Sequence, residues 1–246
     1  MSGTKTLRIG HLYAHFLNIY GDRGNIITLT QRASWRDIES SVDSIGLGQE
    51  FSPDFYDLFF IGGGQDKQQQ VIAEDLQRLA QTMHAAIHGG AVILSICGGY
   101  QLLGQYYRPH SGPELPGISL VDAWTVAGNR RMIGNAVIAR SDERTLVGFE
   151  NHSGRTYLGK SVAALGKVVT GNGNNGEDGL EGCCSTLGAG YVYGTYLHGS
   201  LLPKNPHLAD ELISQALSRR YGPLHLKPLD DSLEMAAHQA ATKFRA

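Results

Sequence analysis

The fold is decided by the stretch Ile93-Leu94-Ser95-Ile96-Cys97-Gly98-Gly99-Tyr100-Gln101-Leu102-Leu103-Gly104. Its apolar first half is typical of a buried parallel strand, and its second half has the pattern of a helix. Cys97 stands at the turn between them, where the small residues Gly98 and Gly99 accommodate a strained backbone. The helix that follows brings its dipole and free N–H groups near the sulfur, where they stabilise negative charge. The stretch therefore predicts a nucleophile elbow.

The alternative for Cys97 is a small buried hydrophobic residue after a strand. The flanking strand, glycines and helix favour the reactive interpretation, whereas Cys183 and Cys184 lack this setting and are interpreted as structural or surface residues. Three cysteines, two of them adjacent, form no disulfide framework and are typical of a reducing compartment. Because the N-terminal stretch lacks the long apolar run of a secretory signal, we expect a cytoplasmic protein.

Strands alternate with helices over the first hundred residues, which predicts an α/β fold with a mostly parallel sheet flanked by helices. The second half is rich in predicted strands, and two helices end the chain. We expect a single domain over residues 1–246. The predicted strands are 7–12, 57–61, 91–96, 118–126, 131–139, 146–150 and 190–197, and the predicted helices are 26–38, 67–88, 206–220 and 230–244.

The composition excludes several classes of protein. Hydrophobic residues make up 41% and charged residues 18%, which is ordinary for a globular chain. A formal net charge of -2 gives no electrostatic footprint for nucleic acid. No apolar run approaches the ~20 residues that a transmembrane helix needs. The unusual feature is glycine, at 32 of 246 residues, clustered where tight turns or close backbone approaches are expected.

The glycine run Gly62-Gly63-Gly64 follows the apolar run at 57–61. The backbone amides of Gly63 and Gly64, together with that of Gly98, are candidates to bind the oxyanion formed when a thiolate attacks a carbonyl group. The alternative is a tight turn, which needs fewer glycines. The chain contains no G-x-x-x-x-G-K-[ST] phosphate loop, and we expect no nucleotide site.

A general base for the thiol is expected at the end of another strand. His198 ends the alternating strand Tyr193-Gly194-Thr195-Tyr196-Leu197 and is the first candidate, and His152 is the second. No C-x-x-C or H-E-x-x-H spacing occurs, so we expect no metal site. The glycine- and asparagine-rich segment 171–178 is either a loop near the site or a simple turn.

Taken together, a strand ending in three glycines, a strand ending in Cys-Gly-Gly and a late strand ending in Tyr-Leu-His-Gly resemble a class I glutamine amidotransferase domain, which has a flavodoxin-like fold. The finer similarity is to the cobyric-acid-synthase-like (CobB/CobQ) branch. Typical class I triads carry a glutamate two residues after the histidine, where this chain has Ser200, and this branch lacks that glutamate too. The segments that carry the resemblance are 17–25, 60–64, 96–101, 148–157, 173–175 and 194–205.

This resemblance implies a glutaminase that hydrolyses L-glutamine through a thioester on Cys97, with His198 as the base. It also implies an arginine that holds the substrate carboxylate in an R-x-x-G context. Arg131 fits that spacing, whereas Arg130 is one residue out of register. For the group that orients the histidine, Asp22, Glu150 and no carboxylate at all remain open.

Within the branch, the segments are most similar to the stand-alone glutaminase subunits that serve the peptidoglycan precursor lipid II. That similarity implies a heterodimer with a Mur-ligase-like (MurT) subunit, which would bind ATP and magnesium and amidate D-glutamate to D-isoglutamine with the ammonia delivered. This chain would then need no cofactor and would reach lipid II only through its partner. The alternatives are a glutaminase component for cobyrinate or another small acid, and a catalytically silent regulatory subunit.

Overall fold

The computed structural model describes residues 4–18, 21–64, 66–199 and 201–243, and contains a six-stranded sheet built mainly from parallel strands. The strand order is β11-β12-β4-β3-β1-β2, and only β11 and β12 pair in antiparallel fashion. The strands are β1 (Thr6–Leu12), β2 (Glu39–Ile45), β3 (Leu58–Ile61), β4 (Val92–Ile96), β11 (Cys183–Leu187) and β12 (Gly190–Thr195).

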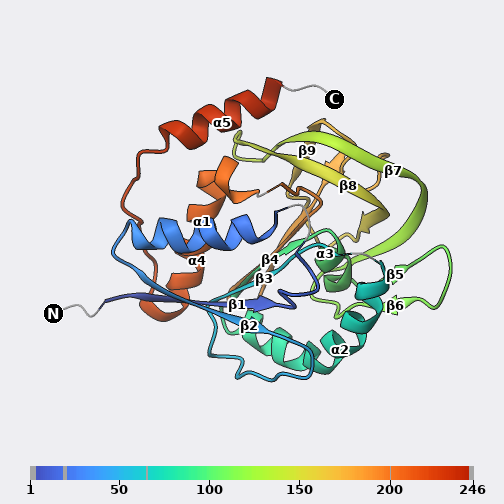
Figure 1. The fold of residues 1–246 in the computed structure, drawn as a ribbon, viewed down its shortest axis with the longest axis horizontal. Coiled ribbons are helices and arrows are strands. Elements are labelled where there is room, and N and C mark those ends of the chain that lie inside the picture. The colour runs from blue at the N-terminus through green and yellow to red at the C-terminus, as the bar shows by residue number, and fades with distance from the viewer. Residues whose placement is uncertain (1–3, 19–20, 65, 200, 244–246) are drawn as a thin grey trace.

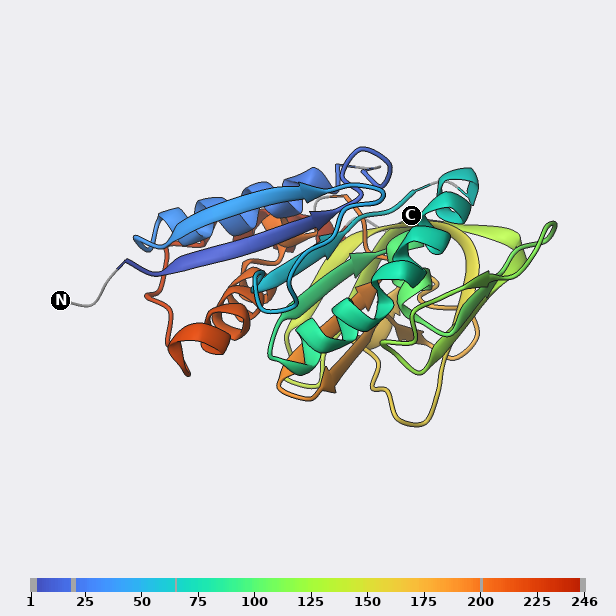
Figure 2. The ribbon, with the colours of Figure 1, turned by 90° about the horizontal axis from the view of Figure 1, so that it is seen from below.

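Helices cover both faces of this sheet. The helices α1 (Arg23–Ser34) and α4 (Pro206–Tyr221) lie on one face and α2 (Asp66–His88) on the other (Figure 1). Figure 2 views the sheet from the side of α2, which lies in front of the strands. Every residue of β3 and β4 is buried, which is why both read as uninterrupted apolar runs. The shorter helical elements are α3 (Gly98–Leu103), the 3₁₀ turn η1 (Leu202–Lys204) and α5 (Ser232–Lys243).

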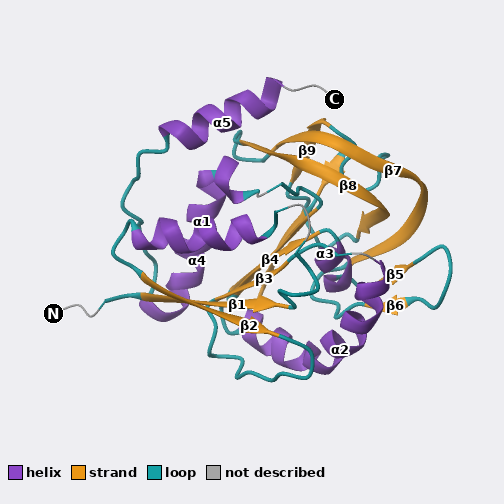
Figure 3. Ribbon diagram, in the orientation of Figure 1, coloured by secondary structure: helices purple, strands orange, loops and turns teal. Residues whose placement is uncertain are grey.

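A second sheet, also of six strands, meets the first at the carboxyl end of its strands (Figure 3). It has the order β10-β9-β7-β5-β6, with β8 paired to β7. The backbone of His198, just beyond β12, pairs with Phe149 of β8 and so joins the two sheets. The strands are β5 (Tyr106–Arg108), β6 (Leu115–Pro116), β7 (Ala123–Ala139), β8 (Thr145–Leu158), β9 (Gly166–Thr170) and β10 (Leu180–Glu181).

The predicted α/β class, with a mostly parallel sheet, flanking helices and a β-rich second half, is confirmed, but several elements differ. The strands β5, β6, β9, β10 and β11 were not predicted, and the strands expected at 118–126 and 131–139 are one strand, β7. The first helix was expected to run to residue 38 and ends at Ser34, because Asp37 has a φ of 57°, which no helix continues through. The strand β2 was missed, since it is an edge strand whose residues before Ile45 are exposed and, apart from Val42, polar. The strand expected at 118–126 begins at Ala123, and the register of β7 with β8 breaks between Ala127 and Met132.

The helices within the described ranges include none that is long and apolar enough to cross a lipid bilayer.

Candidate active site

All the predicted site residues except Arg131, which lies on β7, come together at the carboxyl ends of three adjacent strands. Cys97 follows β4, the Gly62–Gly64 loop follows β3, and His198 lies three residues beyond β12. The strand β4 lies between the other two, since Ile96 pairs with Thr195 and Ser95 pairs with Ile61. Ligands of open parallel sheets bind at this edge, so the topology alone gathers these loops into one place.

Cys97 occupies the turn between β4 and α3 with a φ of 49° and a ψ of −109°, outside the regions that non-glycine residues normally adopt. Its backbone N–H donates to the carbonyl of Thr195 at 2.8 Å, and its side chain is 7% exposed. The next two residues are glycines with little space for a side chain. A Cβ on Gly98 would lie 2.6 Å from Nε2 of Gln69, and one on Gly99 would lie 2.9 Å from the carbonyl oxygen of Gly62.

His198 is fully buried and interacts with two acidic side chains, those of Cys97 and Asp22. Its Nδ1 lies 3.4 Å from Oδ1 of Asp22. Burial alone would lower the pKa of His198, but the charges of Cys97 and Asp22 and hydrogen bonds to both side chains raise it to about 10. The structure thus brings Cys97, His198 and Asp22 together in one line of contacts. Ser200, two residues after His198, lies outside the described residues, as do residues 19–20 of the 17–25 segment.

The two carboxylates left open by the sequence have different partners. Asp22 precedes α1 and makes no side-chain cap hydrogen bond there. Its Oδ2 accepts a hydrogen bond from the backbone N–H of Gly63 at 2.7 Å, while Oδ1 faces His198. Glu150 instead accepts hydrogen bonds from the backbone N–H groups of Asn172 and Gly173, at 2.7 and 3.0 Å, and anchors the 171–178 segment. Of the two, Asp22 is the one in contact with the imidazole.

The glycine loop differs from the expectation at one position. Because the Gly63 amide donates to Asp22, it holds that carboxylate and is not directed at a substrate oxyanion in this structure. The nitrogen of Gly64 lies 3.3 Å from the point that a Cβ on Gly98 would occupy. Gly64 and Gly98 therefore approach each other closely beside the thiol of Cys97.

The two arginines of the R-x-x-G segment point to different neighbours. Arg131 is exposed on β7, and its Nε donates to Oδ1 of Asn151 at 2.5 Å. Arg130 donates to Oδ1 of Asn172 at 3.1 Å, in the 171–178 segment. Asn151 directly precedes His152, and Met132 pairs with His152, so Arg131 lies next to the part of β8 that carries His152.

His152, the second candidate base, is held as a structural element of the site. It lies face to face with the ring of Tyr196, at 3.6 Å between ring centroids and 6° between planes. Its Nδ1 donates to the carbonyl of Gly154 at 2.7 Å. Burial lowers the pKa of His152 to about 4, so the imidazole is neutral over the physiological range. The ranking of His198 before His152 as the base stays a prediction.

The other two cysteines lie apart from the site on β11. Cys183 is fully buried, and burial raises the pKa of its thiol to about 12. Burial also raises the pKa of the half-buried Cys184. High pKa values disfavour the thiolate, in agreement with the structural interpretation of this pair. Among the described residues, no group of three or more histidine, cysteine, aspartate or glutamate side chains is arranged to hold a metal ion.

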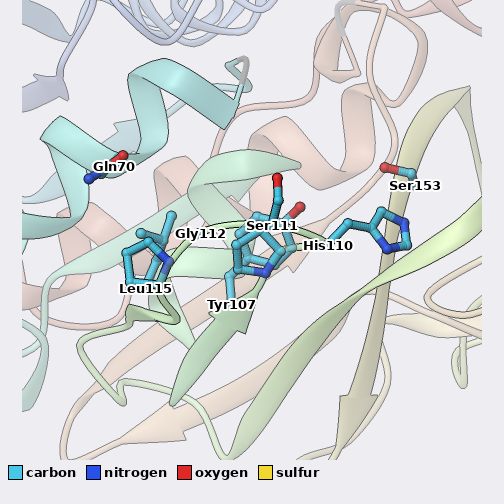
Figure 4. Close-up of a pocket in the computed structure, with 9 residues that line it drawn as sticks. Gln70, Tyr107, His110, Ser111, Gly112, Leu115 and Ser153 are labelled. Atoms are coloured by element: carbon cyan, nitrogen blue, oxygen red, sulfur yellow. The ribbon is translucent and has the colours of Figure 1, made fainter.

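A cavity of about 260 Å³ is lined on one side by Ser153, the residue that follows His152 (Figure 4). It lies between the first turn of α2, the loop that follows β5, and β8. Gln70 and Ser153 line two of its sides, and His110, whose Nε2 donates to the carbonyl of Gly128 at 3.0 Å, lines a third.

Three buried polar residues of the site were missed by sequence reasoning. Gln69 follows the glycine loop, Gln101 follows Cys97 by four residues, and Tyr196 precedes His198 by two. The one sequence feature that could have identified them is their closeness to predicted site residues. Polar and aromatic residues next to a site are common, however, so this feature is not specific. Only their mutual hydrogen bonds single them out.

Comparison with known proteins places this geometry in a family. The sequence model of the CobB/CobQ-like glutamine amidotransferase domain matches residues 8–206. The chain is 40% identical to "Lipid II isoglutaminyl synthase (glutamine-hydrolyzing) subunit GatD" of Streptococcus pneumoniae, over 98% of this chain and 93% of that protein. The protein of the same name from Staphylococcus aureus is 41% identical, over 95% of this chain and 93% of that protein.

A cobyric acid synthase of Limosilactobacillus reuteri is 32% identical over 65% of this chain but only 32% of its own length. The two subunits named GatD, by contrast, match almost from end to end. The chain belongs to the CobB/CobQ-like family of glutamine amidotransferases.

Proposed function

We propose that this chain is the glutaminase subunit of a lipid II isoglutaminyl synthase, folded as a single class I amidotransferase domain. The observation that carries the proposal is the chain of contacts from Asp22 through His198 to Cys97, in which His198 has a pKa raised to about 10. Such an imidazole accepts and keeps the thiol proton. Near-complete alignment with two relatives named as this subunit supports the same assignment.

In the proposed reaction, His198 takes the proton of Cys97, and the thiolate attacks the side-chain carboxamide carbon of L-glutamine. The oxyanion that forms accepts hydrogen bonds from the amides of Gly64 and Gly98. The C–N bond then breaks, His198 protonates the leaving nitrogen, and ammonia departs. A water molecule, deprotonated by His198, hydrolyses the thioester to glutamate and restores the thiol.

The side chain of Arg131 is proposed to bind the α-carboxylate of glutamine. Its guanidinium group can make two parallel hydrogen bonds to a carboxylate, and its Nε is already oriented by Asn151. Asn151 is one residue from His152, whose ring packs against Tyr196. The β7–β8 hairpin would therefore hold the α end of the substrate while the loops of the first sheet act on its amide.

The partner in this proposal is a Mur-ligase-like (MurT) subunit in the cytoplasm. It would bind ATP and magnesium, activate the D-glutamate α-carboxyl of lipid II, and use the ammonia to make D-isoglutamine. The word "subunit" in the relatives' names supports the existence of a partner. Cobyric acid synthases extend well beyond the region shared with this chain, which makes a cobyrinate-type role the weaker assignment.

The test compares two nitrogen sources in the complex of this chain with its ligase subunit. Cys97→Ala is expected to abolish glutamine-dependent amidation of lipid II and to leave ammonia-dependent amidation intact. Cys184→Ala is the matched control, because that half-buried thiol lies on β11, and it should keep both activities. Glutamine-driven turnover by the Cys97→Ala complex would contradict the proposal.

A further inference from the structure

The side chain of Gln69 links the two helices that begin at the site. Gln69 lies in the first turn of α2, just after the glycine loop, and is 1% exposed. Its Nε2 donates to Oε1 of Gln101 at 2.7 Å. Gln101 belongs to α3, which begins immediately after Cys97. One buried hydrogen bond thus joins the segment that follows Gly64 to the segment that contains Gly98.

The amide of Gln69 also lies directly against Gly98. A Cβ on Gly98 would be 2.6 Å from Nε2 of Gln69 and 3.3 Å from the backbone nitrogen of Gly64. The side-chain amide and the Gly64 amide therefore pack on the same face of Gly98. Any shift of Gln69 changes the approach of these two backbone segments, whose N–H groups are the proposed oxyanion donors.

The acceptor of this hydrogen bond is itself held in place. Nε2 of Gln101 donates to the hydroxyl of Tyr196 at 3.1 Å, and that hydroxyl is 2.7 Å from Oγ1 of Thr156. Thr156 in turn is hydrogen-bonded to Thr125 at 2.7 Å. All of these side chains are buried, and networks of satisfied buried hydrogen bonds are rigid. The chain of contacts fixes Gln101, and through it Gln69, to the second sheet.

We propose that Gln69 is a positioning residue for the glutaminase reaction, an inference that rests on the proposed function. It sets the separation of the Gly64 and Gly98 amides by tying α2 to α3, without itself reaching the reacting atoms. An oxyanion hole depends on donors placed about 2.7–3.1 Å from the developing charge. A loosened link would weaken stabilisation of the transition state and leave substrate binding and the nucleophile unchanged.

The test uses Gln69→Ala in the full-length chain with its ligase partner, measuring glutamate release. Because removing an oxyanion donor costs ~10²–10³ in kcat and displacing one costs less, we expect kcat to fall on the order of 10-fold. KM for glutamine should stay within about twofold, since the oxyanion exists only in the transition state. Alkylation of Cys97 by iodoacetamide should keep its wild-type rate, because displacement of iodide forms no oxyanion.

Two further variants sharpen the result. Gln70→Ala changes the neighbouring exposed glutamine, which lines the cavity of Figure 4, and should behave as wild type. Tyr196→Phe keeps the ring against His152 and removes the acceptor for Gln101, so it should give the same pattern with a smaller fall in kcat. It carries the test if Gln69→Ala does not fold.

Unchanged kcat in the folded variants would overturn the proposal, and so would a fall in the alkylation rate parallel to kcat, which would place the effect on Cys97 itself. Neither result affects the proposed function, which fails only if the wild-type complex releases no glutamate or if Cys97→Ala remains active.

Discussion

Asp22→Asn is the sharpest test of the catalytic geometry, because the substitution changes one atom and the carboxylate has two distinct partners. Oδ1 lies 3.4 Å from Nδ1 of His198, and Oδ2 accepts the Gly63 amide at 2.7 Å. An asparagine has only one acceptor oxygen. In one orientation of the asparagine side chain, its NH₂ group faces the imidazole of His198. In the other orientation, its NH₂ group faces the N–H of Gly63.

Both orientations are costly at this fully buried position. If the oxygen stays on Gly63, the NH₂ group faces Nδ1 and favours the tautomer with its proton on Nε2, which cannot accept the thiol proton. If the oxygen turns to His198, the buried Gly63 amide loses its acceptor, which costs about 1–3 kcal/mol. The same change costs ~10⁴ in kcat in serine protease triads, whereas one charge-assisted hydrogen bond is worth about 1.5–3 kcal/mol. We expect kcat to fall on the order of 10²–10³-fold, between these limits.

The assay is glutamate release as a function of pH. The Asp22 charge is one cause of the raised pKa of His198, about 10 in the native protein, so its removal lowers that pKa. The imidazolium then loses its proton at lower pH, and the alkaline limb of the kcat profile should move to lower pH. Glu150→Gln is the control, since it also changes a buried carboxylate to an amide but leaves His198 untouched. An Asp22→Asn protein with native kcat and an unmoved alkaline limb would refute this reasoning.

Other substitutions test the remaining site residues. Arg131→Ala should raise KM for glutamine by on the order of 10–100-fold and leave kcat nearly unchanged, because a carboxylate contact is made equally in ground and transition states. Arg130→Ala should match wild type. If the two results are reversed, Arg130 and not Arg131 is the arginine that binds the substrate carboxylate. His198→Ala should lower kcat by on the order of 10²-fold or more. His152→Ala should chiefly lower the thermal midpoint, through loss of its stack on Tyr196. If His152→Ala has the larger effect on kcat, the base is misassigned.

The sheet was predictable where its strands are buried on both faces. The apolar runs at β3 and β4 have no other stable location, and each ends in the glycines of a site loop. The strand β2 was not predictable, since its backbone pairs with β1 while its side chains face solvent and leave no hydrophobic pattern. Hydrophobic patterns in a sequence reveal strands whose side chains are buried, and most side chains of β2 are exposed.

The candidate site residues divide in the same way. Cys97 and His198 could be proposed from the sequence because each follows a buried strand and is next to a glycine, so a local pattern carries the signal. The pairing of Asp22 with His198 joins residues 176 positions apart, and nothing local separates Asp22 from Glu150. The distinction comes from their different backbone partners, the amide of Gly63 for one and those of the 171–178 segment for the other.

The glycines of the site illustrate what the sequence could not separate. Gly63 and Gly64, together with Gly98, were candidate oxyanion donors, but only the contacts in the structure tell what each glycine does. A Cβ on Gly62 would lie 2.3 Å from the carbonyl oxygen of Leu17, and one on Gly99 would strike Gly62. Gly62 and Gly99 are therefore required for packing, and Gly63 holds Asp22. Gly64 and Gly98 remain the two proposed oxyanion donors. The close packing of glycine loops against one another is itself what holds these two amides beside Cys97.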